Sequence, residues 1–407
     1  MKSLVPTMLV LLLLVFIFPS GTKSLAANIF IDTNDILEPI DRRIFGNAQP
    51  FGHGDVLLEV ENDSWTFHPQ ALSLVSALSP TVLRFPGGNH ADEYFWEDGI
   101  GPHCLRPSPR PGQYEPFGFN YGTDEHMALC EEIGAEAFLT VNYSCGVLGD
   151  SLSALAPLSQ RVGRAADWVE YCNAPNDGSN PNGGIEWAAQ RAENGHPEPY
   201  NVKFWEIGNE VWRGSNPYRV DVETYAQDLK VFSRAMKAVD ASIQIGSVGW
   251  IRPHWCTQWN HSTLEWNATL LRMAHWDFDF LVVHCHYPGS TNISGEDFYR
   301  ASLAGANQTL VDLQEIRRII DQEANSSIGI VPGENGFTVG TEYHWGLQAS
   351  LLAGLQLADT WMNFLEHSST LNIALACGWT LHSHHYGGDI AYQRSTGCRF
   401  HLSLIHI

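Results

Sequence analysis

Short apolar, strand-like runs recur eight times in this sequence, and this recurrence restricts the fold more than any other feature. The runs are rich in β-branched and aromatic residues and lie at Arg43–Ala48, Thr81–Phe85, Ala137–Asn142, Val202–Ile207, Gln244–Val248, Phe280–His286, Ile328–Val331 and Ile373–Leu381. Amphipathic patterns between several of them predict helices over Thr123–Ile133, with a threonine N-cap and a glycine C-cap, Val222–Val239 and Trp345–Leu365. Strand and helix alternating in this way predict an α/β fold, the (β/α)8 TIM barrel.

The first residues of the chain have the pattern of a secretory signal peptide. Met1–Ala26 has a lysine near its start, an apolar run at Met8–Phe18 and small residues at Ser24 and Ala26. The run is too short to span a bilayer, and no later segment looks transmembrane. We therefore expect cleavage near Ala27, a secreted protein, and no membrane partner after cleavage.

The rest of the chain is divided by where the strand-like runs begin and end. We expect an N-terminal strand and lead-in at 27–42, the (β/α)8 barrel at 43–390 and an atypical tail at 391–407. Asn28–Asp32 has the pattern of a strand without sheet partners, and the final RFHLSLIHI has no capping or packing pattern. These features predict an orphan N-terminal strand and a truncated C-terminus.

Export would affect cysteine and asparagine chemistry. An oxidising compartment permits disulfides among the eight cysteines, although their pairing cannot be deduced from the sequence. In a eukaryotic secretory route the protein would be a glycoprotein, with acceptor sequons at Asn62, Asn142, Asn260, Asn267, Asn292, Asn307 and Asn325.

The charge of the chain restricts its partners. The formal charge is −22, from 45 acidic against 23 basic residues, which repels nucleic acids and sulfated glycans. A neutral partner is therefore favoured, and the 14 tryptophans suit a protein that stacks aromatic rings on the sugars of a neutral oligo- or polysaccharide. The oligomeric state has no signature in the sequence.

The stretch KFWEIGNEV places two carboxylates and an amide where a strand ends. Alternation gives Glu206 and Glu210 the same parity and puts Asn209 on the other face, unless the strand ends before it. Gly208 permits such an ending. The arrangement indicates a functional site at a strand tip.

Polar or aromatic side chains occur at the end of most predicted strands. Because the carboxyl ends of barrel strands meet at one mouth, these side chains should converge. They are Arg84, Asn89, Asn142, Asn209, Glu210, His284, His286, Tyr287, Glu334 and Trp379.

Two glutamates at the ends of strands four and seven suit glycoside hydrolysis, in which one carboxylic acid protonates the leaving oxygen and the other attacks or activates water. We expect Glu210 to be the acid and Glu334 the nucleophile. An anionic Glu334 would raise the pKa of Glu210, and Arg84 would keep Glu334 ionised. Asn209 could hydrogen-bond a sugar hydroxyl, and Glu206 would be structural.

A metal centre is an alternative interpretation of the histidines. His284 and His286 share a strand face, and HSHH follows at 382–385, but no third ligand accompanies them at a telling spacing. We therefore expect hydrogen-bonded histidines, with no metal and no cofactor. Glu342 and Asp389 are weaker carboxylate candidates because neither ends an apolar strand.

At these residues the chain resembles the α-L-arabinofuranosidases of glycoside hydrolase family 51, in the clan of retaining barrel glycosidases. The resemblance covers about residues 28–385 and lies in LRFPGGN, YFWEDGIGP, GTDEHMALCEEIGAEAFLTVN, NGHPEPYNVKFWEIGNE and HCHYP. It implies Glu210 as acid/base and Glu334 as nucleophile. It also implies a sugar subsite lined by Arg84, Asn89, Trp96, Asn209 and Tyr287, to which we add His286, and a platform formed by Trp379.

The chain departs from the family pattern in four places. Gly333, Glu334 and Asn335 replace the usual Asp-Glu-Trp, and Gln49 and Pro50 stand where a substrate-contacting glutamate is expected. The glutamine of strand eight is not evident, and the C-terminal β-sandwich is missing. The first three differences concern specificity for arabinofuranose.

The expected function is that of a secreted, retaining α-L-arabinofuranosidase removing terminal arabinofuranose from plant-type polysaccharides. A β-xylosidase, an endoglucanase or a glucuronidase-like enzyme would share the barrel and both glutamates. A non-catalytic carbohydrate-binding barrel would not need Glu210 and Glu334 together.

Overall fold

The computed structural model describes residues 39–61, 63–108, 118–145, 155–212, 219–251, 263–288, 295–324, 327–338, 347, 350–381, 390–393 and 399–402. The expected signal peptide, Met1–Ala26, and the expected strand Asn28–Asp32 lie outside these residues. Both therefore stay predictions.

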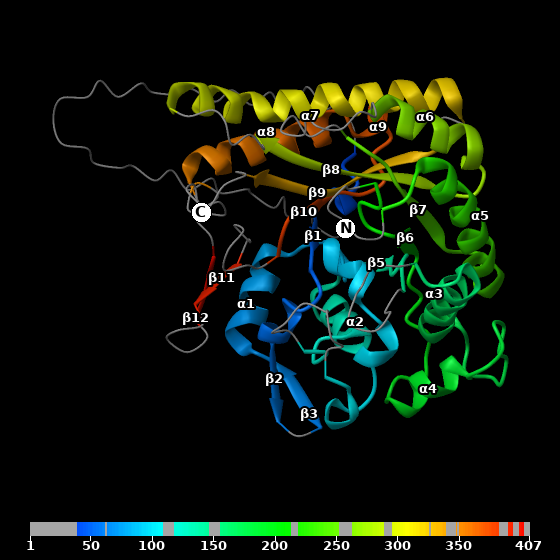
Figure 1. Ribbon diagram of the computed structural model, residues 1–407. Coiled ribbons are helices and arrows are strands. Elements are labelled where there is room, and N and C mark those ends of the chain that lie inside the picture. The colour runs from blue at the N-terminus through cyan, green and yellow to red at the C-terminus, as the bar shows by residue number, and fades with distance from the viewer. Residues whose placement is uncertain are drawn as a thin grey trace, which may run out of the picture. The chain divides into compact units, whose positions relative to one another are not determined.

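Eight parallel strands close into a barrel, which confirms the predicted (β/α)8 fold (Figure 1). Spatial order follows chain order around the barrel: β1 (Gly46–Ala48), β4 (Val82–Phe85), β5 (Glu136–Val141), β6 (Phe204–Ile207), β7 (Gln244–Val248), β8 (Phe280–Pro288), β9 (Gly329–Thr338) and β10 (Cys377–Gly378). Each strand overlaps one of the predicted runs. The pairing of β1 with both β4 and β10 closes the barrel.

Helices occupy the connections between the barrel strands (Figure 1). They are α1 (Pro69–Leu78), α2 (Thr123–Ile133), α3 (Leu158–Asn173), α4 (Trp187–Glu193), α5 (Val222–Val239), α6 (Thr263–Ala274), α7 (Gly295–Glu323), α8 (Leu351–Glu366) and α9 (Ser368–Leu371). Short 3-10 turns cover 42–44, 54–57, 89–93, 96–99 and 103–105. Within the described part of the chain, we find no helix with the length and hydropathy needed to span a bilayer.

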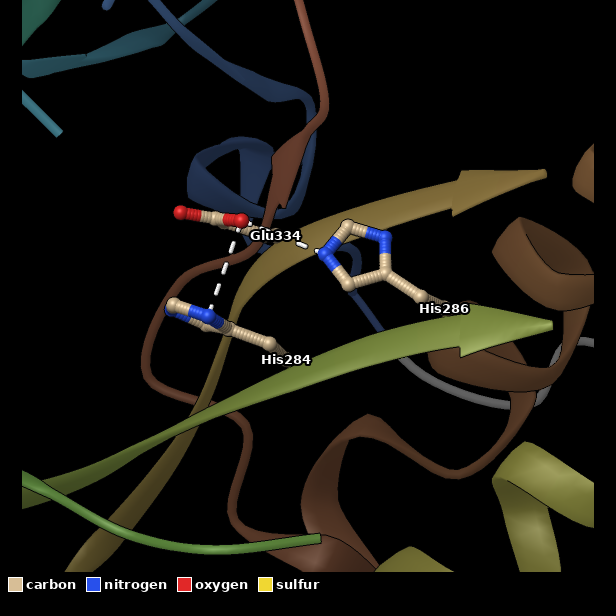
Figure 2. Close-up of side chains that lie close together, drawn as sticks. All are labelled: His284, His286 and Glu334. Atoms are coloured by element: carbon tan, nitrogen blue, oxygen red, sulfur yellow. Dashed lines mark hydrogen bonds and ion pairs between the residues drawn. The ribbon is translucent and has the colours of Figure 1, made fainter. Parts of the chain in front are cut away.

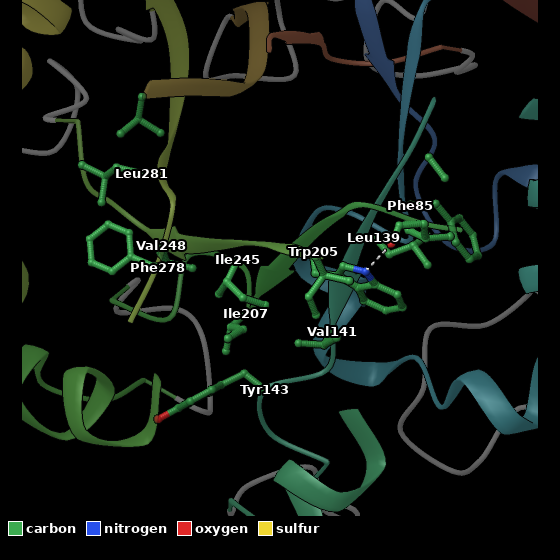
Figure 3. Close-up of a cluster of buried hydrophobic side chains, with 14 of the residues drawn as sticks. Phe85, Leu139, Val141, Tyr143, Trp205, Ile207, Ile245, Val248, Phe278 and Leu281 are labelled. Carbon is green, nitrogen blue, oxygen red and sulfur yellow. Dashed lines mark hydrogen bonds between the residues drawn. The ribbon is translucent and has the colours of Figure 1, made fainter. Parts of the chain in front are cut away.

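Alternation along the strands separates the buried apolar side chains into two layers. Phe138, Phe204 and Phe280 pack together in one cluster with Val82, Val282, Val331, Leu375 and Cys377, which we assign to the barrel interior. The next residue on each strand, such as Leu139, Trp205 or Leu281, belongs to the larger cluster between strands and helices (Figure 3). The period of two therefore determines which side chains face inward.

Capping explains where the predicted helices begin. The N-cap of α2 is Gly122 rather than the expected Thr123, because the Glu125 carboxylate accepts a hydrogen bond from the Gly122 backbone amide at 2.8 Å. Gly134 ends this helix in the left-handed region, as expected. The helix predicted over Trp345–Leu365 begins only at Leu351, because the hydroxyl of Ser350 caps it.

Two antiparallel hairpins lie outside the barrel sheet. The first is β2 (Leu58–Glu61) with β3 (Ser64–Phe67). The second is β11 (Ile390–Gln393) with β12 (Arg399–Leu402), in the segment where the sequence had no recognisable pattern. The sequence pattern did not predict this pairing, and the assignment of 391–407 as an atypical tail stays a prediction.

The structure also bears on the predicted modifications. Asn142 and Asn267 are buried, and the side-chain Nδ2 atom of each donates a hydrogen bond to a backbone carbonyl. Neither side chain can therefore carry a glycan in the folded state, whereas Asn307 is exposed on α7. The described cysteines, Cys104, Cys130, Cys145, Cys172, Cys285 and Cys377, are free thiols.

Candidate active site

Polar side chains continue the inward-facing positions of the barrel at the carboxyl ends of the strands. Arg84 follows the interior Val82 by two residues on β4, and Glu206 follows Phe204 in the same way on β6. On β8, His284 and His286 continue the parity of Val282. The same alternation that builds the apolar interior therefore directs these groups toward one mouth.

The turn after β6 explains the KFWEIGNEV stretch. Gly208 has φ 82°, and a Cβ there would lie only 2.8 Å from Val211 Cγ1 and 2.9 Å from Tyr143 Cβ. Glycine is required for this turn. Because the strand ends at Ile207, Asn209 reaches the same interior as Glu206 instead of the opposite face. Glu210 has φ 44°, a backbone strain held in place at this tip.

Arg84 connects the groups at the mouth. It is fully buried, and its guanidinium donates hydrogen bonds to Glu206 Oε2, Glu334 Oε1 and Asn209 Oδ1, each at 2.8 Å. Burial would lower the pKa of Arg84, but the charges of Glu206 and Glu334 outweigh it and raise this pKa. Glu206 also accepts from the Thr140 hydroxyl at 3.0 Å, consistent with the structural role expected for it.

An irregularity in β9 turns Glu334 into the barrel. Val283 pairs with Pro332 and His284 pairs with Glu334, so that Gly333 is an extra residue in β9. Val331 faces the interior, and in a regular strand Glu334, three residues on, would face outward. The bulge restores the inward direction, a known use of such irregularities beside active sites. A Cβ on Gly333 would lie 2.5 Å from Val282 Cγ1, so the bulge requires glycine.

Glu334 is surrounded by cationic and hydrogen-bonding partners (Figure 2). Its Oε2 lies 3.2 Å from His286 Nε2 and 3.6 Å from His284 Nδ1, while Oε1 contacts Arg84. Burial by itself raises the pKa of Glu334. The charges of His284 and Arg84 and the contact with His286 outweigh burial, so this pKa lies well below its ordinary value.

His284 contacts both candidate catalytic carboxylates. Its Nδ1 is 3.0 Å from Glu210 Oε1 and 3.6 Å from Glu334 Oε2. Burial lowers the pKa of His284, but the charge of Glu334 and the hydrogen bond to Glu210 outweigh it and raise this pKa. The sequence predicted a hydrogen-bonded histidine at the mouth, but not that His284 would contact both carboxylates.

Trp379 packs against Gly88, the residue that precedes Asn89 in the loop after β4. Gly88 packs so closely on the indole that a Cβ would lie 2.5 Å from Trp379 Cη2, which places this ring against the loop after β4. Asn89, the next residue, is exposed and begins the 3-10 turn Asn89–Glu93. The ring therefore lies beside the segment that also carries Arg84, as a platform at the mouth would.

Two residues expected in the sugar subsite are not brought to the carboxylates. Trp96 is buried in an aromatic cluster with Trp168 and Trp187, and its indole N–H donates to the Arg164 carbonyl. Tyr287 has the outward parity of β8, and its phenol donates to Asp312 on α7. These contacts correct the assignment of both side chains to the subsite, since each points into the layer between strands and helices.

Three of the grouped side chains have the chemistry of metal ligands. One nitrogen or oxygen each of His284, His286 and Glu334 lies within 4.8 Å of the others. Glu334 is a third group of this kind, and sequence spacing did not reveal it because it comes from the neighbouring strand. The candidates His382, His384, His385, Glu342 and Asp389 lie outside the described residues.

Comparison with known sequences gives a consistent result. The family model for the α-L-arabinofuranosidase 1 domain matches residues 74–277. The chain is 34% identical over 208 residues to α-L-arabinofuranosidase C of Emericella nidulans, a match covering 50% of this chain and 36% of that protein. It is 28% identical over 298 residues to the intracellular exo-α-(1→5)-L-arabinofuranosidase of Acetivibrio thermocellus, covering 68% and 53%. The matches thus span between about a third and about half of these relatives.

Solved structures show the same similarity. An α-L-arabinofuranosidase of Thermotoga maritima in complex with arabinose superposes with a TM-score of 0.70 at 25% identity, covering 90% of this chain and 69% of that one. A family 51 α-L-arabinofuranosidase of Thermotoga petrophila gives 0.71 at 25% identity, covering 91% and 70%. The similarity extends over almost the whole of this chain.

Proposed function

Because this chain belongs to the α-L-arabinofuranosidases of glycoside hydrolase family 51, we propose that its barrel removes terminal α-L-arabinofuranose from neutral plant-type polysaccharides by a retaining double displacement. The single observation that carries the proposal is that the carboxylates of Glu210 and Glu334 lie 3.0 Å and 3.6 Å from the same imidazole nitrogen, His284 Nδ1.

Glu334 is the nucleophile in this mechanism. Its low pKa keeps the carboxylate ionised, and Arg84 fixes Oε1, so that Oε2 on the other side can attack the anomeric carbon. The attack forms a glycosyl–Glu334 ester and breaks the bond to the leaving oxygen. The cationic groups around Glu334 partly neutralise its negative charge. They also hold the carboxylate in one orientation, which reduces the entropy lost on reaching the transition state.

Glu210 is the acid and then the base. As the bond breaks it gives its proton to the leaving oxygen, and it then removes a proton from the water that hydrolyses the ester. The Oε1 of Glu210 and the Oε2 of Glu334 cannot lie further apart than the sum of their 3.0 and 3.6 Å distances from His284 Nδ1. Retaining enzymes need a separation of about 5–5.5 Å and inverting enzymes about 6.5–9.5 Å. This upper limit admits the retaining separation and reaches only the lower edge of the inverting range, so the proposal of retention rests mainly on membership in family 51.

Asn209 supports the proposal from the substrate side. Its Oδ1 is held by Arg84 at 2.8 Å, and its buried Nδ2 has no hydrogen-bond partner within the described part of the chain. A buried donor left without an acceptor costs free energy. A hydroxyl of the bound sugar beside the reacting carbon would supply that acceptor, and Trp379 would supply an apolar face for the ring.

Secretion is part of the proposal and depends on the sequence of Met1–Ala26. The relative from Acetivibrio thermocellus is named as intracellular, so membership in the family does not determine the compartment. The excess of 45 acidic over 23 basic residues favours a neutral glycan as substrate.

A panel of nitrophenyl glycosides tests the function. We expect the full chain to hydrolyse the α-L-arabinofuranoside at least about 10-fold faster, by kcat/KM, than the β-xyloside or β-glucuronide. In the presence of methanol, a retaining enzyme transfers the sugar to give the methyl α-L-arabinofuranoside. Faster hydrolysis of another glycoside would refute the substrate, and the β-anomer would refute retention.

A further inference from the structure

The His284, His286 and Glu334 cluster carries an inference that glycoside hydrolysis does not require. Both imidazoles project from the inward face of β8 toward the same carboxylate on β9 (Figure 2). His286 Nε2 lies 3.2 Å and His284 Nδ1 lies 3.6 Å from Glu334 Oε2. We propose that these three side chains bind one divalent transition-metal ion, of the class of Zn²⁺, and that this ion blocks the nucleophile.

The spacing fits such an ion without movement of the backbone. Two ligand atoms at about 2.0–2.2 Å from a tetrahedral ion lie about 3.3–3.6 Å apart. The two distances to Glu334 Oε2 are close to this range, and all three ligand atoms lie within 4.8 Å of one another. Small rotations of the side chains are sufficient to bring them around one ion. The carboxylate of Glu210, 3.0 Å from His284 Nδ1, lies close enough to be a fourth ligand.

The charge of the surroundings favours a divalent cation. The carboxylates of Glu206 and Glu334 both contact the guanidinium of Arg84, so two negative charges face one positive charge even when Glu210 is not counted. A divalent ion would balance the excess negative charge. The burial of Glu334, which is 5% exposed, strengthens this attraction because little water screens it.

The ligand types determine which ions are bound. Two imidazole nitrogens with carboxylate oxygen suit Zn²⁺, Cu²⁺ or Ni²⁺, whereas Mg²⁺ and Ca²⁺ require sites built largely from oxygen ligands. We therefore expect Zn²⁺ to bind and Mg²⁺ not to compete.

Binding would inhibit hydrolysis rather than support it. Oε1 of Glu334 is already held by Arg84 at 2.8 Å, so an ion on Oε2 would occupy the remaining oxygen that can attack the sugar. This consequence rests on the proposed function, whereas metal binding itself does not. Chelators should leave hydrolysis intact, and added Zn²⁺ should inhibit it in competition with substrate.

Calorimetric titration of the chelator-treated full chain with Zn²⁺ tests the binding directly, without an activity measurement. We expect one Zn²⁺ per chain at the cluster, and a loss of affinity of at least about 10-fold in His286→Gln and in His284→Gln. The matched control is His196→Gln, which replaces a half-buried histidine on the loop before β6 and should bind Zn²⁺ as the parent does. Circular dichroism in chelator shows whether each variant folds.

Two outcomes would overturn the proposal. The first is equal affinity for Zn²⁺ in the parent and in a folded His286→Gln or His284→Gln variant. The second is loss of binding when His382, His384 and His385 are replaced together by Gln, with binding retained in the cluster variants. If neither cluster variant folds, electron paramagnetic resonance of Cu²⁺ bound to the variant with His382, His384 and His385 replaced by Gln tests the site instead. The proposal requires two nitrogen ligands to Cu²⁺ in that variant, and a spectrum without them would overturn it. Binding of Zn²⁺ without inhibition would refute only the proposed competition with substrate, and the metal site itself would stand.

Discussion

The inside of the barrel has two halves that are built from the same strands with opposite chemistry. Val82, Phe204 and Val282 pack in the apolar half, and two residues further along the same strands Arg84, Glu206 and His284 form a buried polar network. The apolar half gains free energy by leaving water. The charged groups of the polar half lose their hydration on folding, and only well-placed ion pairs and hydrogen bonds offset that cost. The two halves therefore share the same strands, but the apolar half supplies stability and the polar half supplies the groups for chemistry.

The largest expected effect is the loss of the nucleophile from the polar half. Glu334→Ala should lower kcat/KM by at least about 10⁴-fold, equivalent to about 5.5 kcal/mol of activation free energy, because no glycosyl ester can form. The measurement is hydrolysis of nitrophenyl α-L-arabinofuranoside. The control is Glu296→Ala, an exposed glutamate paired with Arg300 on α7, which should retain parental activity. Residual activity within 10-fold of the parent would exclude Glu334 as the nucleophile.

The next effect is expected in the apolar half. Phe204→Ala should destabilise the protein by about 3–5 kcal/mol, because it removes a buried ring and leaves a cavity in the barrel interior. Urea unfolding measures this change. Trp276→Ala, at a side chain that is 79% exposed, should change stability by less than about 0.5 kcal/mol. If the folded fraction of Phe204→Ala lost activity as Glu334→Ala does, the division between the two halves would be incorrect.

The acid and the nucleophile can be separated within the polar half. Glu210→Ala should slow hydrolysis of natural arabinosides by about 10²–10³-fold, or about 2.7–4.1 kcal/mol, but spare substrates whose leaving group needs no proton. Azide should then accelerate deglycosylation of Glu210→Ala and give a glycosyl azide of retained configuration. A glycosyl azide formed by Glu334→Ala should instead have inverted configuration, because azide would replace the missing carboxylate in a single displacement. Equal losses on activated and natural substrates, with no rescue of either variant, would reject the two roles.

The fold was predictable because its signal is repeated along the chain. Neighbouring residues of a strand-like run pack into different apolar layers. Phe204, for example, lies in the barrel interior, and Trp205 lies between the strands and the helices, so the run as a whole is apolar. An error at one boundary does not change the number of strands. The start of α8 was misplaced because the Ser350 cap is a single local contact.

The site was predicted in part, because strand tips identify candidates without fixing their direction. Arg84 was expected to contact Glu334 and does. Tyr287 was misassigned because β8 continues to Pro288, so alternation turns the phenol outward. The inward direction of Glu334 depends on the bulge at Gly333, and the burial of Trp96 depends on packing against α3 and α4. Both features depend on residues that are distant in the sequence, so the local sequence pattern did not predict them.

Two histidines extend the comparison to charge. His284, at the mouth, has its pKa raised because carboxylates outweigh its burial. His126, on α2, is fully buried against Phe85, and burial lowers its pKa from 6.5 to about 3. The apolar layer therefore excludes a charge that the polar half of the barrel would accept.

The smallest expected effect follows from His126 and concerns stability against pH. Its folded-state pKa lies below that of the unfolded chain, so the unfolded state binds the additional proton. The contribution of His126 is therefore complete above about pH 6.5 and is lost as the pH falls, with a limiting slope of about 1.4 kcal/mol per pH unit. In His126→Gln, urea unfolding between pH 7 and pH 5 should show a shallower decline by about that slope, even if the variant is less stable at pH 7, whereas His196→Gln should match the parent. Parallel declines for the parent and His126→Gln would mean that His126 takes up its proton in the folded state, and the apolar layer would then be less restrictive toward charge than its packing implies.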